Sequence, residues 1–166
     1  MPAAGIFAAG QVGLRDACST RSDSRSCVAI LSPMEANEVR VALEAGWPEL
    51  ASMLVEHDAD PVTGGLSYLE MSAVTRFLAE KLRAGDTVKF GPFFEAVEVC
   101  LHEGSDEAVT LVMVGLLEDL QNSNITDMEM GVWVPFLGPT TRRAWKAVED
   151  FWNGDVDAIA RFSVQA

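Results

Sequence analysis

The chain has 166 residues, 49% hydrophobic and 22% charged, which suits one globular domain with its own core. Its net charge of −13 and pI near 4.4 disfavour nucleic acid and anionic membranes as partners, since both are negatively charged. The cysteines, Cys18, Cys27 and Cys100, are odd in number, and two lie in the N-terminal segment, which argues against a disulfide framework. No CxxC pair is present, which argues against a zinc site. Cys100 is expected to be a buried apolar residue.

Residues 1–32 are rich in Ala, Gly, Ser and Arg and contain CSTRSDSRSC, a composition that predicts a disordered leader. Residues 1–33 carry three arginines against two aspartates, a net of +1, so the rest of the chain carries −14. No Lys or Arg precedes the opening AAGIFAAG, and the apolar stretch is too short to cross a bilayer. We therefore expect a cytoplasmic protein with one helical domain over residues 33–166.

Two helices are predicted next along the chain. Ser32 fits an N-cap that forms a capping box with Glu35, and Gly46 fits the end of that helix. Pro48 then begins a second helix, PELASMLVEH. Its last residue, His57, suits a helix C-terminus, where the dipole favours a cation.

Apolar residues at helical spacing continue in the next two segments. LSYLEMSAVTRFLAEKLRAG begins with a capping box of Ser67 and Glu70, and Gly85 follows its end. PFFEAVEVCLHEG begins at Pro92 and ends at Gly104. Both segments therefore predict amphipathic helices.

The stretch from Asp106 to Gln121 contains the most apolar run of the chain, LVMVGLL. Ser105 fits an N-cap, and acids follow it in the first turn, where the helix dipole favours them. Sixteen residues are too many for an ordinary strand. A helix that is apolar on nearly every side belongs at the centre of a fold.

The segment NITDMEMGVWVPFLGP is less regular and predicts either a short strand or an anchored loop. Trp133 lies in it, either as an exposed anchor for a partner or as part of the core. TTRRAWKAVEDFWNG then predicts a helix with an apolar stripe of Trp145, Val148 and Trp152, and a last short turn follows Asp155. The chain is thus predicted to be all-α, with about six helices in a compact bundle or a short helical-hairpin stack.

Glu118 and Asp119 lie near the end of the central helix, where the macrodipole opposes each carboxylate by about 0.3–1 kcal/mol. Something must compensate for this cost. The compensation comes either from a partner or from a cation of the same chain, for which the candidates are Arg76, Arg142, Arg143 and Lys146. We expect internal compensation for at least one of the two acids, and Glu118 to be the more buried.

Glu95, Glu98 and His102 share one helix face and resemble half of a carboxylate metal site. The Glu-x-x-x-His spacing occurs once, so a solvated stripe with a Glu98–His102 contact is favoured over a metal site. No GxSxG, GxxxxGK[ST] or HExxH motif is present, so we expect no catalytic residue, metal or cofactor. The candidate partner-binding residues are Glu95, Glu98, Glu118, Asp119 and Trp133.

Three strings, LSYLEMSAVTRFLAEKL, FFEAVEVCLHEGSDEAVTLVMVGLLEDLQN and FLGPTTRRAWKAVEDFW, resemble a group of small bacterial domains of unknown function. The resemblance covers residues 36–153 and includes a Leu-Glu-Asp-Leu element at 117–120 and a Leu-Gly-Pro turn at 137–139. It implies an all-α fold and carries over no catalytic residue. Such proteins are similar in size and acidity to immunity proteins of bacterial toxin systems.

Three functional hypotheses follow. The first is a non-catalytic acidic binding protein, an immunity protein that neutralises a basic toxin domain, because an acidic surface attracts a site evolved for nucleic acid. The alternative is a helical interaction or scaffold module with a groove for a partner segment. An enzyme that uses a carboxylate and histidine metal site is the third.

Overall fold

The computed structural model describes residues 32–55 and 68–165, and these residues are all-α, as predicted. Residues 1–31 of the predicted leader and His57 lie outside them. The described part holds nine α-helices rather than about six, because the central helix is divided, a short α7 follows it, and the last turn is a full helix. They are α1 (Ala36–Gly46), α2 (Glu49–Val55), α3 (Tyr68–Arg83), α4 (Phe90–Glu103), α5 (Asp106–Thr110), α6 (Glu118–Gln121), α7 (Ser123–Thr126), α8 (Pro139–Trp152) and α9 (Ala158–Gln165).

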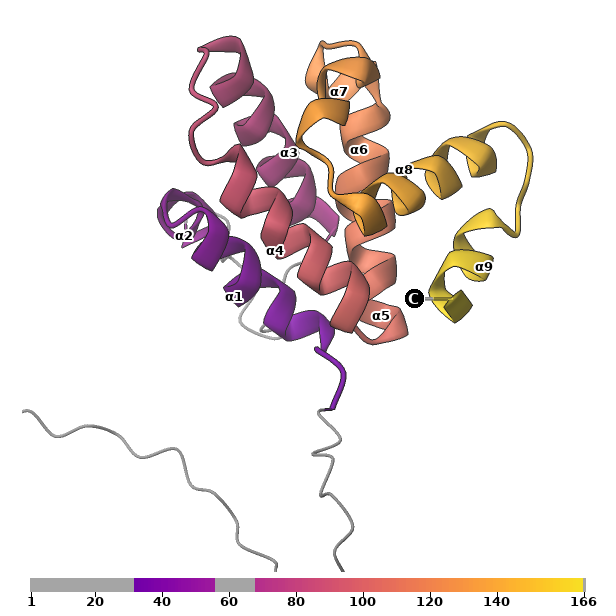
Figure 1. Cartoon of the computed structure of the whole chain (residues 1–166). Helices are drawn as coiled ribbons and strands as arrows, with labels where there is room; N and C mark the ends of the chain where they lie inside the picture. The colour runs from indigo at the N-terminus through magenta and orange to yellow at the C-terminus, as the bar shows by residue number, and fades with distance from the viewer. Residues whose placement is uncertain (1–31, 56–67, 166) are drawn as a thin grey trace, which may run out of the picture. The chain divides into compact units, whose positions relative to one another are not determined.

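The helices surround the predicted central one. The central helix runs from α5 through η1 (Leu111–Leu117) to α6 and packs against α3, α4 and α8. The helix α1 lies along α4, and α8 extends away from α4 before the chain turns back into α9 (Figure 1). Within the described ranges, no helix has both the length and the apolarity needed to cross a bilayer.

The first helix begins later than predicted. Met34 is extended rather than helical, because its N–H donates to the Glu103 carbonyl and its carbonyl accepts from the Ser105 N–H, each at 2.8 Å. The capping box predicted for Ser32 is therefore formed one turn later, by Glu35 and the third residue of α1.

Aromatic rings of Trp47, of α4 and of the segment before α8 pack together in the core. Trp133 is 0% exposed and lies 6.1 Å from the Phe90 ring, so it belongs to the core and not to the surface. Its segment forms two 3-10 turns, η2 (Met130–Val132) and η3 (Val134–Phe136), instead of a strand. Cys100 is buried as predicted, and this burial raises the pKa of its thiol to about 12.

The middle of the central helix, η1, is a π-helix, which the sequence did not predict. The Glu118 N–H bonds to the carbonyl of Met113, five residues earlier, which makes the turn wider than in an α-helix. The wider turn changes which side chains align along the helix. Gly115 lies in this segment, where a Cβ atom would come within 3.0 Å of the Met71 side chain on α3.

Glu98 of α4 holds the N-terminus of α8. Its carboxylate accepts hydrogen bonds from the N–H groups of Thr140 and Thr141 and from the Thr141 hydroxyl, the last at 2.6 Å. The N-cap of α8 is Gly138, and a Cβ atom there would lie 2.5 Å from the Glu98 carboxylate. Glycine therefore leaves room for a carboxylate from another helix to act as the cap.

The predicted contact between Glu98 and His102 is not formed, because the Glu98 carboxylate is bound to α8. Burial acts to raise the pKa of Glu98, but the hydrogen bonds from Thr140 and Thr141 outweigh it, so this pKa lies below its ordinary value. The folded state therefore prefers the charged form of Glu98. Its contribution to stability is present above the unfolded pKa and is lost as the pH falls through the folded pKa.

We expect Glu98→Ala to lower the free energy of unfolding at pH 7 by about 1–2 kcal/mol, because helix donors lose their acceptor. Urea denaturation measures this. The loss relative to the wild type should shrink as the pH falls below 4.5, the ordinary pKa of this group. Glu95→Ala, an exposed position one turn earlier on α4, is the control and should change stability by less than about 0.5 kcal/mol. An equal loss in the two variants would contradict the capping role.

Candidate functional site

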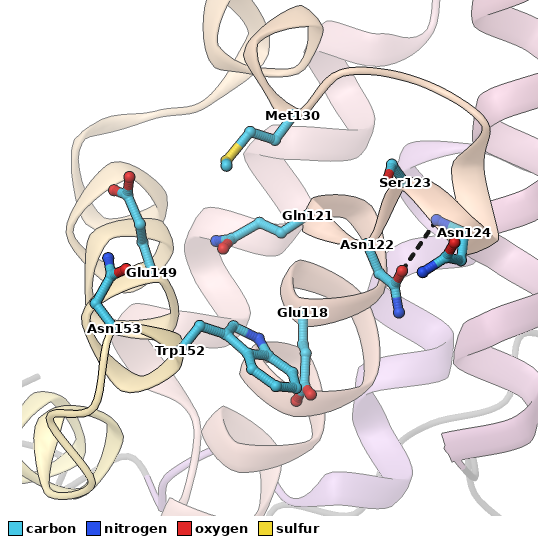
Figure 2. Close-up of a pocket in the computed structure, with 9 residues that line it drawn as sticks. All are labelled: Glu118, Gln121, Asn122, Ser123, Asn124, Met130, Glu149, Trp152 and Asn153. Atoms are coloured by element: carbon cyan, nitrogen blue, oxygen red, sulfur yellow. Dashed lines mark hydrogen bonds between the residues drawn. The ribbon is translucent and has the colours of Figure 1, made fainter.

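A pocket of about 420 Å³ lies between α6, the segment around α7 and the C-terminal half of α8 (Figure 2). Two carboxylates, one indole ring, one thioether and several amides line it. We call it the acidic pocket, and the lining side chains that matter most are Glu118, Gln121, Asn122, Glu149, Trp152 and Asn153.

Local hydrogen bonds fix the walls of the acidic pocket. Asn122 ends α6 and caps α7, and its side-chain oxygen accepts from the Asn124 N–H at 3.0 Å. Gln121 donates from its amide to the Trp145 carbonyl at 2.9 Å, which ties α6 to α8. These hydrogen bonds fix the position of α6, which carries Glu118, relative to α8, which carries Glu149.

Glu118 is half-buried on the α6 wall. Burial, and secondly the neighbouring charge of Asp119, raise the pKa of Glu118 above its ordinary value. Within residues 32–55 and 68–165 its carboxylate has no hydrogen-bond or ion-pair partner, so none of the four predicted cations pairs with it. The negative charge of Glu118 thus has no compensating group near the C-terminus of the central helix, where the helix dipole disfavours a carboxylate.

Asp119 is compensated inside the fold. Its carboxylate accepts a hydrogen bond from the Ser72 hydroxyl of α3. Internal compensation was predicted for at least one of the two acids, and Asp119 receives it from a neutral hydroxyl instead of a cation. The adjacent acids therefore have different environments, one bound to α3 and the other facing the acidic pocket.

The other wall carries Glu149 and Trp152 of α8, which were not among the predicted binding residues. Trp152 was predicted to share a core stripe with Trp145 and Val148, but its side chain is 62% exposed, whereas the other two are buried. The C-terminal end of α8 extends past the core, so its last turn faces the pocket instead. Glu149 is half-buried, and its charge is among the causes that raise the pKa of Lys146, after the hydrogen bond to Asp150.

The five predicted binding residues do not form one site. Glu118 lines the acidic pocket, and Asp119 lies beside it on the α3 side. Glu95 is exposed on α4, Glu98 caps α8, and Trp133 is in the core. Among the described residues, no three His, Cys, Asp or Glu side chains lie where they could hold one metal ion.

The acidic pocket combines features that suit an organic cation. Carboxylates form charge-assisted hydrogen bonds with ammonium and guanidinium groups. The exposed Trp152 ring offers a face for a cation or for the apolar stem of a Lys or Arg side chain. The amides of Gln121 and Asn122 supply neutral hydrogen-bonding groups beside the carboxylates.

The chain belongs to a family of domains of unknown function (DUF7674), whose model matches residues 41–153. The matched region includes every residue that lines the acidic pocket and both motifs, 117–120 and 137–139, that carried the resemblance. No curated protein and no solved structure matches the chain. The predicted resemblance to a family of domains of unknown function is therefore confirmed.

We expect Glu118→Gln to raise the free energy of unfolding at pH 7, by up to about 1 kcal/mol, because it removes a charge that burial, Asp119 and the helix end oppose. The raised pKa means that the folded state prefers protonated Glu118. The wild type should therefore lose stability as the pH rises above 4.5 through the folded pKa, and the variant should lose less. Thermal denaturation over pH 4–8 measures both effects.

Glu107→Gln is the matched control for this prediction. Glu107 is exposed in the first turn of the same helix, where the dipole favours an acid, so its replacement should be neutral or slightly destabilising. A lower stability of Glu118→Gln at pH 7 would show that Glu118 has a compensating partner after all.

Proposed function

We propose that the domain is a non-catalytic binding protein whose acidic pocket receives a Lys or Arg side chain of a basic protein partner. The observation that carries the proposal is Glu118, a half-buried carboxylate without a partner among the described residues, on the wall of a pocket. The exposed Trp152, whose ring is turned toward Glu118, and Glu149, farther along α8, line the same pocket (Figure 2).

Charged Glu118 has an electrostatic cost in the free protein, because burial and the charge of Asp119 disfavour its ionised form. A cation in the pocket would lower the pKa of Glu118 toward its ordinary value and remove the penalty for keeping it charged. Charge-assisted hydrogen bonds are about twice as strong as neutral ones. Contact with Trp152 would add about 0.5–2 kcal/mol, depending on how far water is excluded.

The charge of the whole chain supports the same class of partner. A net charge of −13 attracts basic proteins over a distance and raises their association rate. A toxin domain that acts on nucleic acid has a basic active site, and we propose neutralisation of such a domain, as an immunity protein, as the specific form of this function. The proposed location is the cytoplasm, where cysteines remain reduced.

A short basic peptide, tetralysine with an acetylated N-terminus and an amidated C-terminus, tests the acidic pocket directly. We expect the peptide to bind the full chain and to bind the double variant Glu118→Gln/Glu149→Gln at least about tenfold more weakly, which is about 1.4 kcal/mol. Isothermal titration calorimetry measures the affinity. Affinity for the wild type should rise with pH as Glu118 loses its proton.

The control for this experiment is Glu80→Gln/Glu103→Gln. Both residues are exposed on helices outside the acidic pocket, so this variant loses the same two charges. It should weaken binding only through the general field, by less than about threefold at 0.15 M salt, where the Debye length is about 8 Å. Equal losses in the two double variants would reduce the proposal to non-specific attraction.

The immunity form makes a separate prediction. A basic toxin domain encoded beside the gene should be inhibited by an equimolar amount of the wild-type protein and less by Glu118→Gln/Glu149→Gln. Toxin activity in the presence of each variant measures this. Full inhibition by the variant would place the toxin interface elsewhere on the domain.

A further inference from the structure

A second pocket, of about 430 Å³, lies between α8 and α9 on a different face of α8. We call it the basic pocket. It is lined by four cations and a single carboxylate, together with small apolar side chains and one phenyl ring: Arg142, Arg143, Lys146, Asp150, Arg161 and Phe162. One third of the 12 Lys and Arg residues of this acidic chain thus line one open pocket.

Three of the four cations are held by groups of the domain. Arg142 donates to the carbonyls of Leu137, at 2.9 Å, and Val134, at 3.3 Å. Lys146 pairs with Asp150 one turn along α8. Arg161 pairs with Asp155, with one of its two contacts at 3.1 Å. These contacts fix the positions of the positive groups around the pocket. The two ion pairs are exposed, and such pairs contribute little to the stability of the fold.

Arg143 is the exception. Its guanidinium lies 5.5 Å from the centre of the Phe162 ring. In the part of the chain that the structure describes, it has neither an ion pair nor a hydrogen bond. The contact with Phe162 therefore orients the Arg143 guanidinium, while its N–H groups remain free to donate hydrogen bonds to a ligand.

The charge balance selects the ligand. Asp150 and Asp155 pair with Lys146 and Arg161, which leaves the charges of Arg142 and Arg143 without a carboxylate partner. Glu149 and Asp157, which act on Lys146 and Arg161 from outside the pocket wall, reduce this excess of up to two positive charges. A carboxylate ligand would match half of this excess, whereas a phosphate monoester carries about −1.5 to −2 at neutral pH. Guanidinium groups also match phosphate oxygens in bidentate geometry.

The remaining lining indicates what the phosphate is attached to. Phe162, Ala147 and Ala158 give the pocket an apolar side. Its volume lies in the range of pockets that take organic ligands, about 300–1,000 Å³, and exceeds what a bare ion needs. The N-terminus of α8 is already occupied by Glu98, so side chains and not helix N–H groups would bind the anion.

We propose that the basic pocket binds a phosphate monoester of a small organic molecule. Arg143 would be the main residue that contacts the phosphate, with Arg161 and Lys146 beside it. The net negative charge of the protein opposes anions at a distance. At 0.15 M salt, however, the Debye length is about 8 Å, so the groups around the pocket, among them Arg142 and Arg143 without a carboxylate partner, outweigh distant charges in the local potential. This site is separate from the acidic pocket and does not depend on the function proposed for it.

Phenyl phosphate is the probe, and isothermal titration calorimetry on the full chain measures its affinity. Inorganic phosphate tests whether the organic part contributes, and benzoate tests whether phosphate is preferred to a carboxylate. We expect phenyl phosphate to bind more tightly than either. Arg143→Gln should weaken it at least about tenfold, because a charge-assisted bidentate contact is lost.

Asp150→Asn should act in the opposite direction. It removes the carboxylate in the pocket wall and frees Lys146, so phenyl phosphate should bind about threefold to tenfold more tightly. A gain in affinity in Asp150→Asn can be measured even if Arg143→Gln does not fold. Arg76→Gln, an exposed cation of α3 that does not line the basic pocket, is the control with the same loss of one charge.

Three results would overturn the proposal. Equal weakening by Arg76→Gln and Arg143→Gln would mean that anions are attracted without a site. Unchanged or weaker binding in Asp150→Asn would mean that the ligand lies elsewhere. Equal affinity for benzoate and phenyl phosphate would remove the charge argument for a phosphate monoester.

Discussion

Both pockets depend on the hydrogen bonds between the Glu98 carboxylate and the start of α8. The helix α8 supplies one wall of the acidic pocket and one wall of the basic pocket, so its placement decides whether either exists. Its N-cap residue, Gly138, has no side chain to satisfy the first N–H groups. A carboxylate from α4 does so instead, and glycine is the residue that lets it approach. Capping and tertiary docking of α8 are therefore the same interaction.

Glu98 and Glu118 show how the same side chain takes opposite roles. Glu98 meets helix N–H groups and a hydroxyl, which stabilise its charge and lower its pKa despite partial burial. Glu118 lies near a helix C-terminus beside Asp119, where burial and a like charge raise its pKa. A group whose charge is satisfied within the fold contributes to stability, whereas one whose charge is not satisfied is available to a ligand. Environment, and not residue type, separates the structural acid from the candidate binding residue.

Sequence patterns predicted the elements better than the site. The run from Asp106 to Gln121 was predicted to be a central helix, and it is one, because length and uniform apolarity are local properties. The π-helical middle, η1, packs against α3 and leaves no signal in residue spacing. Trp152 repeats the helical spacing of buried residues, yet spacing does not tell where a helix passes beyond the core. The partner of Glu98 is 42 residues away, so only the folded chain reveals it.

Long-range and short-range electrostatics act differently on this domain. The net charge of −13 determines which molecules approach, and it favours basic partners. Within about a Debye length, roughly 8 Å, the local side chains decide what remains bound, so a basic pocket on an acidic protein is physically consistent. Lys146 and Glu149 lie close together on α8, each in the wall of a different pocket, and the charge of Glu149 favours the charged form of Lys146. A cation bound near Glu149 and an anion bound near Lys146 would attract each other across the helix. By thermodynamic linkage each would then raise the affinity of the other by the same factor.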